Sequence, residues 1–406
     1  MHPKAFIETV HESDEGEKHL VLNFGPQHPA THGTLRLVLK LDGERIVECC
    51  PEIGYLHTGF EKLAEHLSYP QFITLTDRMN YMSAISNNIG FAVAVEELLG
   101  MEVPPRGQVL RVILAELTRI ADHIISIGLQ AMDMGAFSVM LWSFQEREKI
   151  YDIIEACCGS RLTTSYTRIG GLMRDAPADF ADQVKLFCDR FPANFNDIEG
   201  ILTKNRIYLD RVRGAGAMSR EEAIEWSLCG PVLRACGVAH DIRRSRPYCG
   251  YEDYDFEVIT HTDGDAYARW RVRADEIRES LKIIRQGLDR LPPGPVNLPN
   301  RKQALPGKRD VYTDMESMIH HFELVMWGHG FRPPKEGEIY SCTEAPNGEL
   351  GYYIVTDGSP NPSRVRVRPP SFLNYAALPT MIRDHLISDA IACLSSLNVI
   401  AGELDR

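Results

Sequence analysis

The chain has 406 residues, of which 44% are hydrophobic and 25% charged, proportions typical of a globular protein with a sizeable buried core. Its formal net charge of −12 argues against binding to nucleic acid, which requires clustered Lys and Arg. The ten cysteines include no C-x-x-C pair, the spacing that offers two thiolates to zinc or an iron–sulfur cluster, so we expect reduced and mostly buried thiols.

We expect neither a signal peptide nor a membrane span. The first residues, Met1 to Lys4, contain no apolar run. The most apolar long stretch, residues 124–144, is interrupted by Gln130 and Asp133, whereas a span needs about 20 predominantly apolar residues. We therefore predict a buried helix there, in a protein that is soluble or attached to a membrane through partners.

Alternation of apolar and polar residues predicts a small sheet near the N-terminus. The alternation occurs in two runs, residues 35–39 and 45–47. Asp42-Gly43 lies between the runs and is a common hairpin turn.

Helical spacing then dominates. An apolar stripe runs from Leu110 to Ile125 behind Pro105, and Glu116, Arg119 and His123 share another face of the same helix. A capping box at Ser219-x-x-Glu222 opens a further helix. The most regular helical pattern covers residues 266–291 and is stopped by a Pro-rich segment.

The C-terminal part is rich in Pro, Gly and Asn and contains short alternating runs. Residues 351–355 and 364–368 flank Asp357-Gly358 and are predicted to form a strand pair. The chain is therefore expected to have an α+β fold, a helical bundle with small sheets at both ends.

We find no internal repeat, and nothing in the sequence compels a division into separate domains. Residues 1–18 are polar and are expected to form a flexible arm before a single domain over residues 19–406. Within it, we place the N-terminal sheet in 19–60, the helical core in 61–295 and an α/β segment in 296–406.

The first candidate for chemistry is the loop Gly25–Gly33, which contains His28 and His32. Two histidines four residues apart form half of a zinc site on a helix, but Pro29 between them makes a helix unfavourable. A metal pair and a Gly/Pro-rich loop that presents a polar histidine both remain open. A histidine satisfied within its own loop is the commoner outcome.

Two further candidates are polar groups between apolar stretches. One is the segment Thr76–Ser83, which contains Tyr81. The other is Asp133, whose carboxylate must be paired or have a raised pKa. It is either satisfied by an Arg or by backbone N–H groups, or it orients a histidine.

Two familiar motifs are missing. No G-x-G-x-x-G loop follows a strand, so this chain is not expected to bind NADH or a flavin nucleotide itself. Gly-x-Ser-x-Gly is also absent, and serine hydrolase chemistry has no specific support.

Several segments together resemble one known family across nearly the whole chain. They are Gly25–Gly33 with Leu35-Arg36, Leu56–His66, Arg111–Arg119, Glu146–Glu148, Arg168–Gly171, Leu233–Gly237, Pro247-Tyr248, Gly348–Gly351 and Pro370–Phe372. The chain thereby resembles the D subunit of proton-pumping NADH:quinone oxidoreductase, respiratory complex I, a relative of the nickel–iron hydrogenase large subunit. Such blocks in this order are more specific than any single motif.

The resemblance implies a hydrogenase-large-subunit-like fold and a site for the quinone headgroup. Electrons would arrive from an iron–sulfur cluster held by the neighbouring B subunit, and this chain would hold no cofactor and be inactive alone. Subunits B, C, I and H and quinone are the implied partners. The implied location is peripheral, on the cytoplasmic side of a bacterial inner membrane or its organelle equivalent.

The resemblance also assigns site residues. His32 and Tyr81 match the residues that hold the two quinone oxygens, and Asp133 matches the carboxylate paired with that histidine. A phenol with an ordinary pKa of about 10 and an imidazole near about 6.5 are suitable donors to a quinone as it is reduced.

The comparison with hydrogenases predicts no metal. The four thiolate ligand positions correspond to Asn80, Ser83, Ile400 and Glu403, and nickel has no cage without soft thiolates. The segment at Asn398-Val399 departs from the Asp-Pro usual in the family, and we assign it no role.

Three alternatives remain. One is a scaffold of the same fold without a redox site. Another is the equivalent subunit of a related complex with a different electron donor. The third is a true metal hydrogenase, which the missing thiols disfavour.

Overall fold

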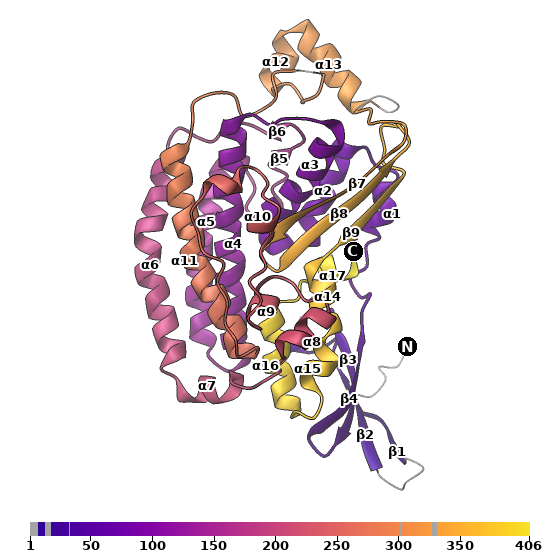
Figure 1. Cartoon of the computed structure of the whole chain (residues 1–406), viewed down its shortest axis with the longest axis vertical. Coiled ribbons are helices and arrows are strands. Elements are labelled where there is room, and N and C mark those ends of the chain that lie inside the picture. The colour runs from indigo at the N-terminus through magenta and orange to yellow at the C-terminus, as the bar shows by residue number, and fades with distance from the viewer. Residues whose placement is uncertain (1–6, 13–17, 32, 301, 327–330) are drawn as a thin grey trace.

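A computed structural model of the chain describes residues 7–12, 18–31, 33–300, 302–326 and 331–406. Its helices form the centre of the molecule, and small sheets lie toward the N- and C-terminal ends (Figure 1). The fold is α+β, as the sequence predicted.

The N-terminal sheet is a four-stranded antiparallel meander. Its strands, in spatial order, are β1 (Ile7–Glu12), β2 (Lys18–Phe24), β3 (Arg36–Asp42) and β4 (Arg45–Glu52). The predicted hairpin is confirmed: β3 pairs with β4, and Gly43 between them has a φ of 60°, which favours glycine. Leu37, Leu39 and Leu41 alternate along β3 and are buried, so this face of the sheet packs on the core.

The flexible arm predicted over residues 1–18 is wrong for residues 7–12. These residues form β1, whose backbone pairs antiparallel with β2. The segment is rich in β-branched residues, and an edge strand offers unpaired backbone groups to such a segment. Residues 1–6 and 13–17 lie outside the described residues.

Four long helices form the bundle and stand side by side in Figure 1. They are α4 (Pro105–Asp133), α5 (Phe137–Cys158), α6 (Phe180–Thr203) and α11 (Ala266–Arg290). The helices predicted behind Pro105 and over residues 266–291 are thus confirmed. No helix combining the length and hydropathy of a membrane span was found in the part of the chain that the structure describes.

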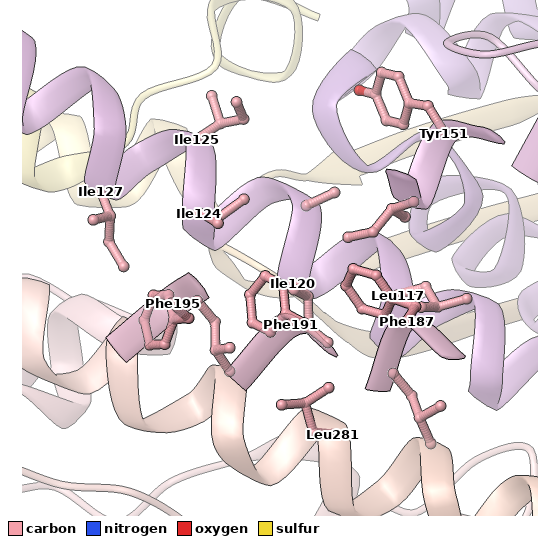
Figure 2. Packing of buried hydrophobic residues seen from close by; sticks show 14 of the residues in the cluster. Leu117, Ile120, Ile124, Ile125, Ile127, Tyr151, Phe187, Phe191, Phe195 and Leu281 are labelled. Atoms are coloured by element: carbon pink, nitrogen blue, oxygen red, sulfur yellow. The ribbon is translucent and has the colours of Figure 1, made fainter. Parts of the chain in front are cut away.

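The bundle core is built from the apolar stripe of α4. Leu117, Ile120 and Ile124 are fully buried in one cluster with Phe191 of α6 and Leu281 of α11 (Figure 2). Burying each such side chain stabilises the fold by about 1.5–3 kcal/mol. The apolar stripe therefore predicted correctly which face of α4 packs into the core.

The single buried helix predicted over residues 124–144 is wrong. The stretch comprises the end of α4 and the start of α5, separated by a turn at 134–136. Gly135 in this turn has a φ of 94°, which an L side chain rarely adopts. The break makes Asp133 the last residue of α4.

A three-stranded antiparallel sheet lies on the side of α4 that faces away from α6 and α11 (Figure 1). Its strands are β7 (Gly337–Ala345), β8 (Gly348–Thr356) and β9 (Arg364–Arg368), in that order. The predicted pair of residues 351–355 and 364–368 is confirmed as β8 and β9. β7 was not predicted, because its second half buries Ser341, Thr343 and Glu344 and so shows no alternation.

The remaining elements connect these layers and complete the C-terminus. They are α1 (Phe60–Ala64), α2 (Tyr69–Met79), η2 (Tyr81–Ser83), α3 (Ala84–Leu99), β5 (Thr167–Arg168), β6 (Gly171–Leu172), α7 (Arg206–Val212), α8 (Arg220–Glu225), α9 (Gly230–Arg234), α10 (Ile242–Ser245), α12 (Lys308–Thr313), α13 (Met315–Val325), α14 (Pro370–Ala376), α15 (Leu378–Ile382), α16 (Ile387–Leu397) and α17 (Ala401–Asp405), with the short 3-10 turns η1 (Pro29–Thr31) and η3 (Tyr251–Asp253). The capping box predicted at Ser219 and Glu222 is confirmed at the start of α8.

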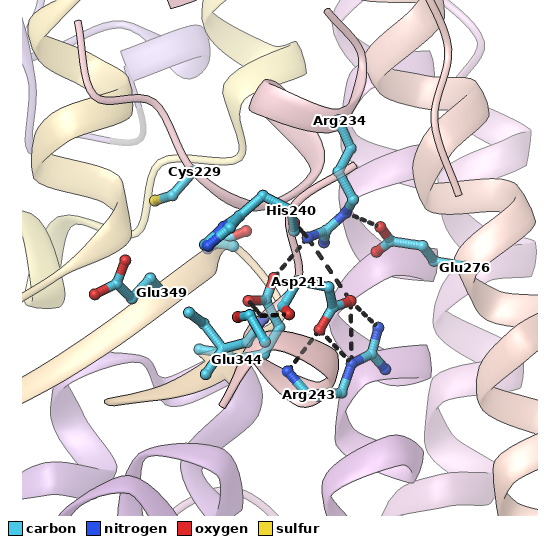
Figure 3. Close-up of polar contacts among 12 residues, drawn as sticks. Cys229, Arg234, His240, Asp241, Arg243, Glu276, Glu344 and Glu349 are labelled. Atoms are coloured by element: carbon cyan, nitrogen blue, oxygen red, sulfur yellow. Dashed lines mark hydrogen bonds and ion pairs between the residues drawn. The ribbon is translucent and has the colours of Figure 1, made fainter. Parts of the chain in front are cut away.

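A buried ionic network joins the bundle to the C-terminal sheet. Arg234 of α9 bonds Glu276 of α11 at 2.7 Å and Glu344 of β7 at 2.8 Å (Figure 3). From α4, His123 lies 2.9 Å from Glu276, and Arg119 donates to the Glu344 carbonyl at 2.6 Å. The polar face that the sequence predicted on α4 is thus the contact between the two layers.

Candidate functional site

Tyr81 is positioned by a capped turn after α2. The Asn80 side-chain oxygen accepts hydrogen bonds from the backbone N–H groups of Met82 and Ser83, at 3.1 and 3.2 Å. Asn80 is fully buried, so this cap fixes the turn that carries Tyr81. Burial raises the pKa of the half-buried Tyr81 phenol; Asp122 raises it further and Arg78 opposes the change. Tyr81 is therefore a neutral phenol that holds its proton.

One face of α4 lies opposite Tyr81. Asp122, Ser126, Leu129 and Asp133 follow at i, i+4, i+7 and i+11 and so share that face. The last three line a cavity together with Tyr81. The sequence positions singled out at 81 and 133 are thus brought to one site.

Four segments that lie far apart in the chain meet at the cavity. Its volume is about 80 Å³, and it is also lined by Thr34 and Leu35, by Leu394 of α16 and by residues 398–401. Pockets that enclose a small molecule usually measure roughly 300–1,000 Å³. The cavity within the described residues is therefore smaller than the usual enclosure of a small molecule.

Asp133 is a poorly compensated carboxyl. Burial raises its pKa to about 6. Its Oδ2 atom is buried and has no hydrogen-bond partner within the described part of the chain. Of the two outcomes expected for an isolated carboxylate, pairing or a raised pKa, the burial of Asp133 without a hydrogen-bond partner for Oδ2 among the described residues favours the raised pKa.

His32, the third predicted site residue, lies outside the described residues. Thr34 and Leu35, which follow it closely in the chain, line the cavity. His28 is engaged within its own loop: its Nδ1 atom accepts from the Ala30 N–H at 3.2 Å, and its ring lies 4.3 Å from that of Phe24. His28 therefore matches the loop histidine rather than the metal ligand.

Sequence reasoning missed Asn398 and Asp122. Asn398 lines the cavity in a left-handed conformation with a φ of 54°. Its Nδ2 atom donates to Asp122 Oδ1 at 2.6 Å and to Asn347 Oδ1 at 2.7 Å. Asp122 is a carboxyl within an apolar helix, the same signal that singled out Asp133, and it could have been found on that ground.

The two segments that the sequence analysis matched to hydrogenase ligand motifs also come together. A Cβ atom added to Gly402 of α17 would lie 2.5 Å from the Arg78 carbonyl oxygen, so α17 packs directly against the end of α2. Glu403 is fully buried and accepts from the Ser371 N–H at 3.1 Å and from the Ser371 hydroxyl. Burial raises the pKa of Glu403 to about 7.

The described residues contain no group of three or more His, Cys, Asp or Glu side chains that could hold a metal ion. A larger cavity, of about 610 Å³, lies near α12 and α13 and is lined mainly by apolar residues. Neither of the described candidate site residues, Tyr81 and Asp133, is among the residues that line it. The smaller cavity is therefore the candidate site, because the Tyr81 phenol and the Asp133 carboxyl meet there.

Comparisons with known proteins agree on one family. The sequence model for "Respiratory-chain NADH dehydrogenase, 49 Kd subunit" matches residues 133–406. The chain is 50% identical over 387 residues to the D subunit of the NADH-quinone oxidoreductase of Geotalea uraniireducens (strain Rf4), covering 95% of this chain and 98% of that protein. It is 48% identical over 399 residues to the D subunit of the same enzyme from Methylacidiphilum infernorum (isolate V4), covering 98% and 94%. The chain belongs to the family of the 49 Kd subunit of respiratory-chain NADH dehydrogenase.

Proposed function

We propose that this chain forms the quinone headgroup site of a proton-pumping NADH:quinone oxidoreductase and supplies protons to the reduced quinone. The observation that carries the proposal is the meeting of Tyr81 and Asp133 at one cavity, although the two residues belong to different elements and lie far apart in the sequence. Family membership supports it, because the relatives are named NADH-quinone oxidoreductases.

Tyr81 suits the proton-donating role. Reducing a quinone adds two electrons and two protons, and negative charge develops on its oxygens, where an aimed donor is most effective. Because burial and Asp122 both raise the pKa of Tyr81, its phenol keeps the proton until a strongly basic oxygen is present. Tyr81 would donate a hydrogen bond to one quinone oxygen and then its proton.

In the proposal, His32 holds the other quinone oxygen and Asp133 pairs with His32. The Asp133 carboxylate would favour a cationic imidazole and fix its tautomer. The unpartnered Oδ2 atom of Asp133 is consistent with such a partner, since a buried carboxyl oxygen without a hydrogen bond is costly. Loss of the His32 proton would leave Asp133 less compensated, and we propose this change as the link to proton pumping.

The site is completed by other subunits. Electrons come from the iron–sulfur cluster of the neighbouring B subunit, and subunits C, I and H are the other partners. The small volume of the cavity supports a shared site, because the headgroup extends beyond this chain's own walls. The chain would be inactive alone and peripheral, on the cytoplasmic side of the inner membrane or its organelle equivalent.

The test is Tyr81→Phe in membranes that contain the assembled complex, assayed for NADH:quinone and NADH:artificial-acceptor activity. We expect quinone reduction to fall by about 10²–10³, the usual effect of losing one aimed donor, with artificial-acceptor activity retained. Tyr208→Phe is the matched control, because it removes a buried phenolic oxygen outside the cavity. Normal quinone reduction by Tyr81→Phe would support the scaffold alternative instead.

Replacing the other two residues extends the test. His32→Ala and Asp133→Asn should give the same pattern, milder for Asp133→Asn because the amide still fills the space. Unchanged quinone reduction in both would contradict the assigned roles. Stoichiometric nickel in the purified protein would support a hydrogenase and overturn the proposal.

A further inference from the structure

A buried carboxyl lies one helical turn before the cavity. Asp122 precedes Ser126 by four residues on α4, on the face that lines the cavity, and it is 1% exposed. Its Oδ1 atom accepts from Asn398 at 2.6 Å. Its Oδ2 atom has no hydrogen-bond partner within the described residues, so one carboxyl oxygen remains available to carry a proton.

Charged and titratable groups surround Asp122 from five elements. They are Arg119 on α4 itself, Arg273 on α11, Tyr151 on α5, Tyr81 in η2 and Glu403 on α17. Burial raises the pKa of Asp122 to about 6, and Asn398, the two arginines and Asn80 oppose the rise. Protonated and ionised forms of Asp122 are therefore both accessible near neutral pH.

Asp122 and Tyr81 disfavour each other's ionisation. Asp122 raises the pKa of Tyr81, and the interaction is reciprocal because it is the repulsion between two negative charges. A Tyr81 phenolate beside an ionised Asp122 is thus the least stable combination. Tyr81 gives up its proton most readily when Asp122 still holds one to replace it.

We propose that Asp122 supplies the proton that replaces the one Tyr81 donates, and that Asn398 positions Asp122 for this transfer. The inference rests on the proposed function. Asp122 does not line the cavity, so it acts through Tyr81. Ser126 lines the cavity one turn later, and its buried hydroxyl has no hydrogen-bond partner among the described residues, so it can turn to accept from Asp122 and donate to Tyr81.

The transfer is balanced. Two electrons from the iron–sulfur cluster reduce the quinone. The Tyr81 O–H bond breaks and its proton forms an O–H bond on one quinone oxygen, while an N–H bond of His32 breaks and its proton forms the O–H bond on the other oxygen. The O–H bond of protonated Asp122 then breaks, Ser126 accepts this proton while releasing its own, and a new O–H bond forms on the Tyr81 oxygen. The ionised Asp122 is left facing Arg273 until it takes up a proton.

The test uses Asp122→Asn in membranes with the assembled complex, with quinone reduction measured from about pH 5 to about pH 9 and artificial-acceptor activity as the control. Asn keeps an oxygen that can accept from Asn398 but has no proton to give. In the parent we expect quinone reduction to fall as pH rises through about 6, the pKa of Asp122. In Asp122→Asn we expect a rate at least about ten-fold lower with that pH limb absent.

A second variant moves the carboxyl across the same hydrogen bond. Asp122→Asn combined with Asn398→Asp keeps one carboxyl and one amide at this contact, and we expect it to recover most of the rate and the pH limb. If the double variant does not recover quinone reduction, the proposal is overturned. The same holds if Asp122→Asn alone impairs assembly, because the double variant is then the test. A parent-like rate and pH profile in Asp122→Asn, with Tyr81→Phe defective, would overturn this inference and leave the proposed function standing. Normal activity in both variants would overturn the two together.

Discussion

Replacing Glu403 by Gln tests how strongly burial disfavours charge beside the cavity. Glu403 is fully buried, and burial raises its pKa from an ordinary 4.5 to about 7. The folded protein therefore binds this proton more tightly than the unfolded chain does. The cost of ionising Glu403 is absent below about pH 4.5 and complete above about pH 7, so stability is lost as pH rises through that window.

The magnitude follows from the shift. Each pKa unit corresponds to about 1.4 kcal/mol, so the cost is about 1 kcal/mol at about pH 5 and about 3.4 kcal/mol at about pH 9. Glu403→Gln stays neutral and its side-chain oxygen can still accept from Ser371, so it should avoid this cost. We expect the free energy of unfolding of the variant, relative to that of the parent, to be about 2.5 kcal/mol higher at the higher pH than at the lower one.

Urea unfolding of the purified chain, followed by far-ultraviolet circular dichroism at both pH values, measures the difference. Asp122 and Asp133 also have raised pKa values, and their contributions cancel to first order because both proteins carry them. A parent and variant whose stabilities change in parallel with pH would show that Glu403 does not titrate in this range. The account of burial at the site would then be refuted.

Two further predictions concern the scaffold, both checked by the same urea unfolding. Arg234→Met leaves Glu276 and Glu344 without their shared guanidinium and should destabilise the chain by about 3–5 kcal/mol; a loss below about 1 kcal/mol would contradict the bridging role. Gly230→Ala should cost roughly 2–4 kcal/mol, because Gly230 has a φ of 63° and an added Cβ would lie 2.4 Å from the Asn347 carbonyl oxygen. Gly200→Ala is its control, since a Cβ there meets nothing within 4 Å in a helix and should be neutral or stabilising.

Regular elements were predictable where one physical pattern decided them. The helix over residues 266–291 and the hairpin at Asp42-Gly43 follow from periodicity and turn chemistry, which are local. β7 escaped prediction because its buried Glu344 side chain is satisfied by partners distant in sequence, Arg234 and the Ile242 N–H. The break before α5 escaped because an apolar run alone does not show where a helix ends.

The sequence predicted some residues of the candidate site but not all the residues that surround the cavity. Tyr81 and Asp133 were chosen through the family resemblance, and a polar residue between apolar stretches was their only signal within the chain itself. Asn398 was given no role, because Asn398-Val399 departs from the Asp-Pro usual in the family. Its importance arises from a hydrogen bond to Asp122, 276 residues earlier.

The sequence by itself determined the family, the helical bundle with sheets at both ends and the kinds of group available for proton chemistry. Periodicity and motifs are properties of neighbouring residues and can be read along the chain. Only the tertiary structure decided that the loop before β3, the η2 turn after α2, one face of α4 and the C-terminal segment enclose a single cavity. It also decided which carboxyls lose their solvent there, because pKa values depend on burial and on charges that folding brings together.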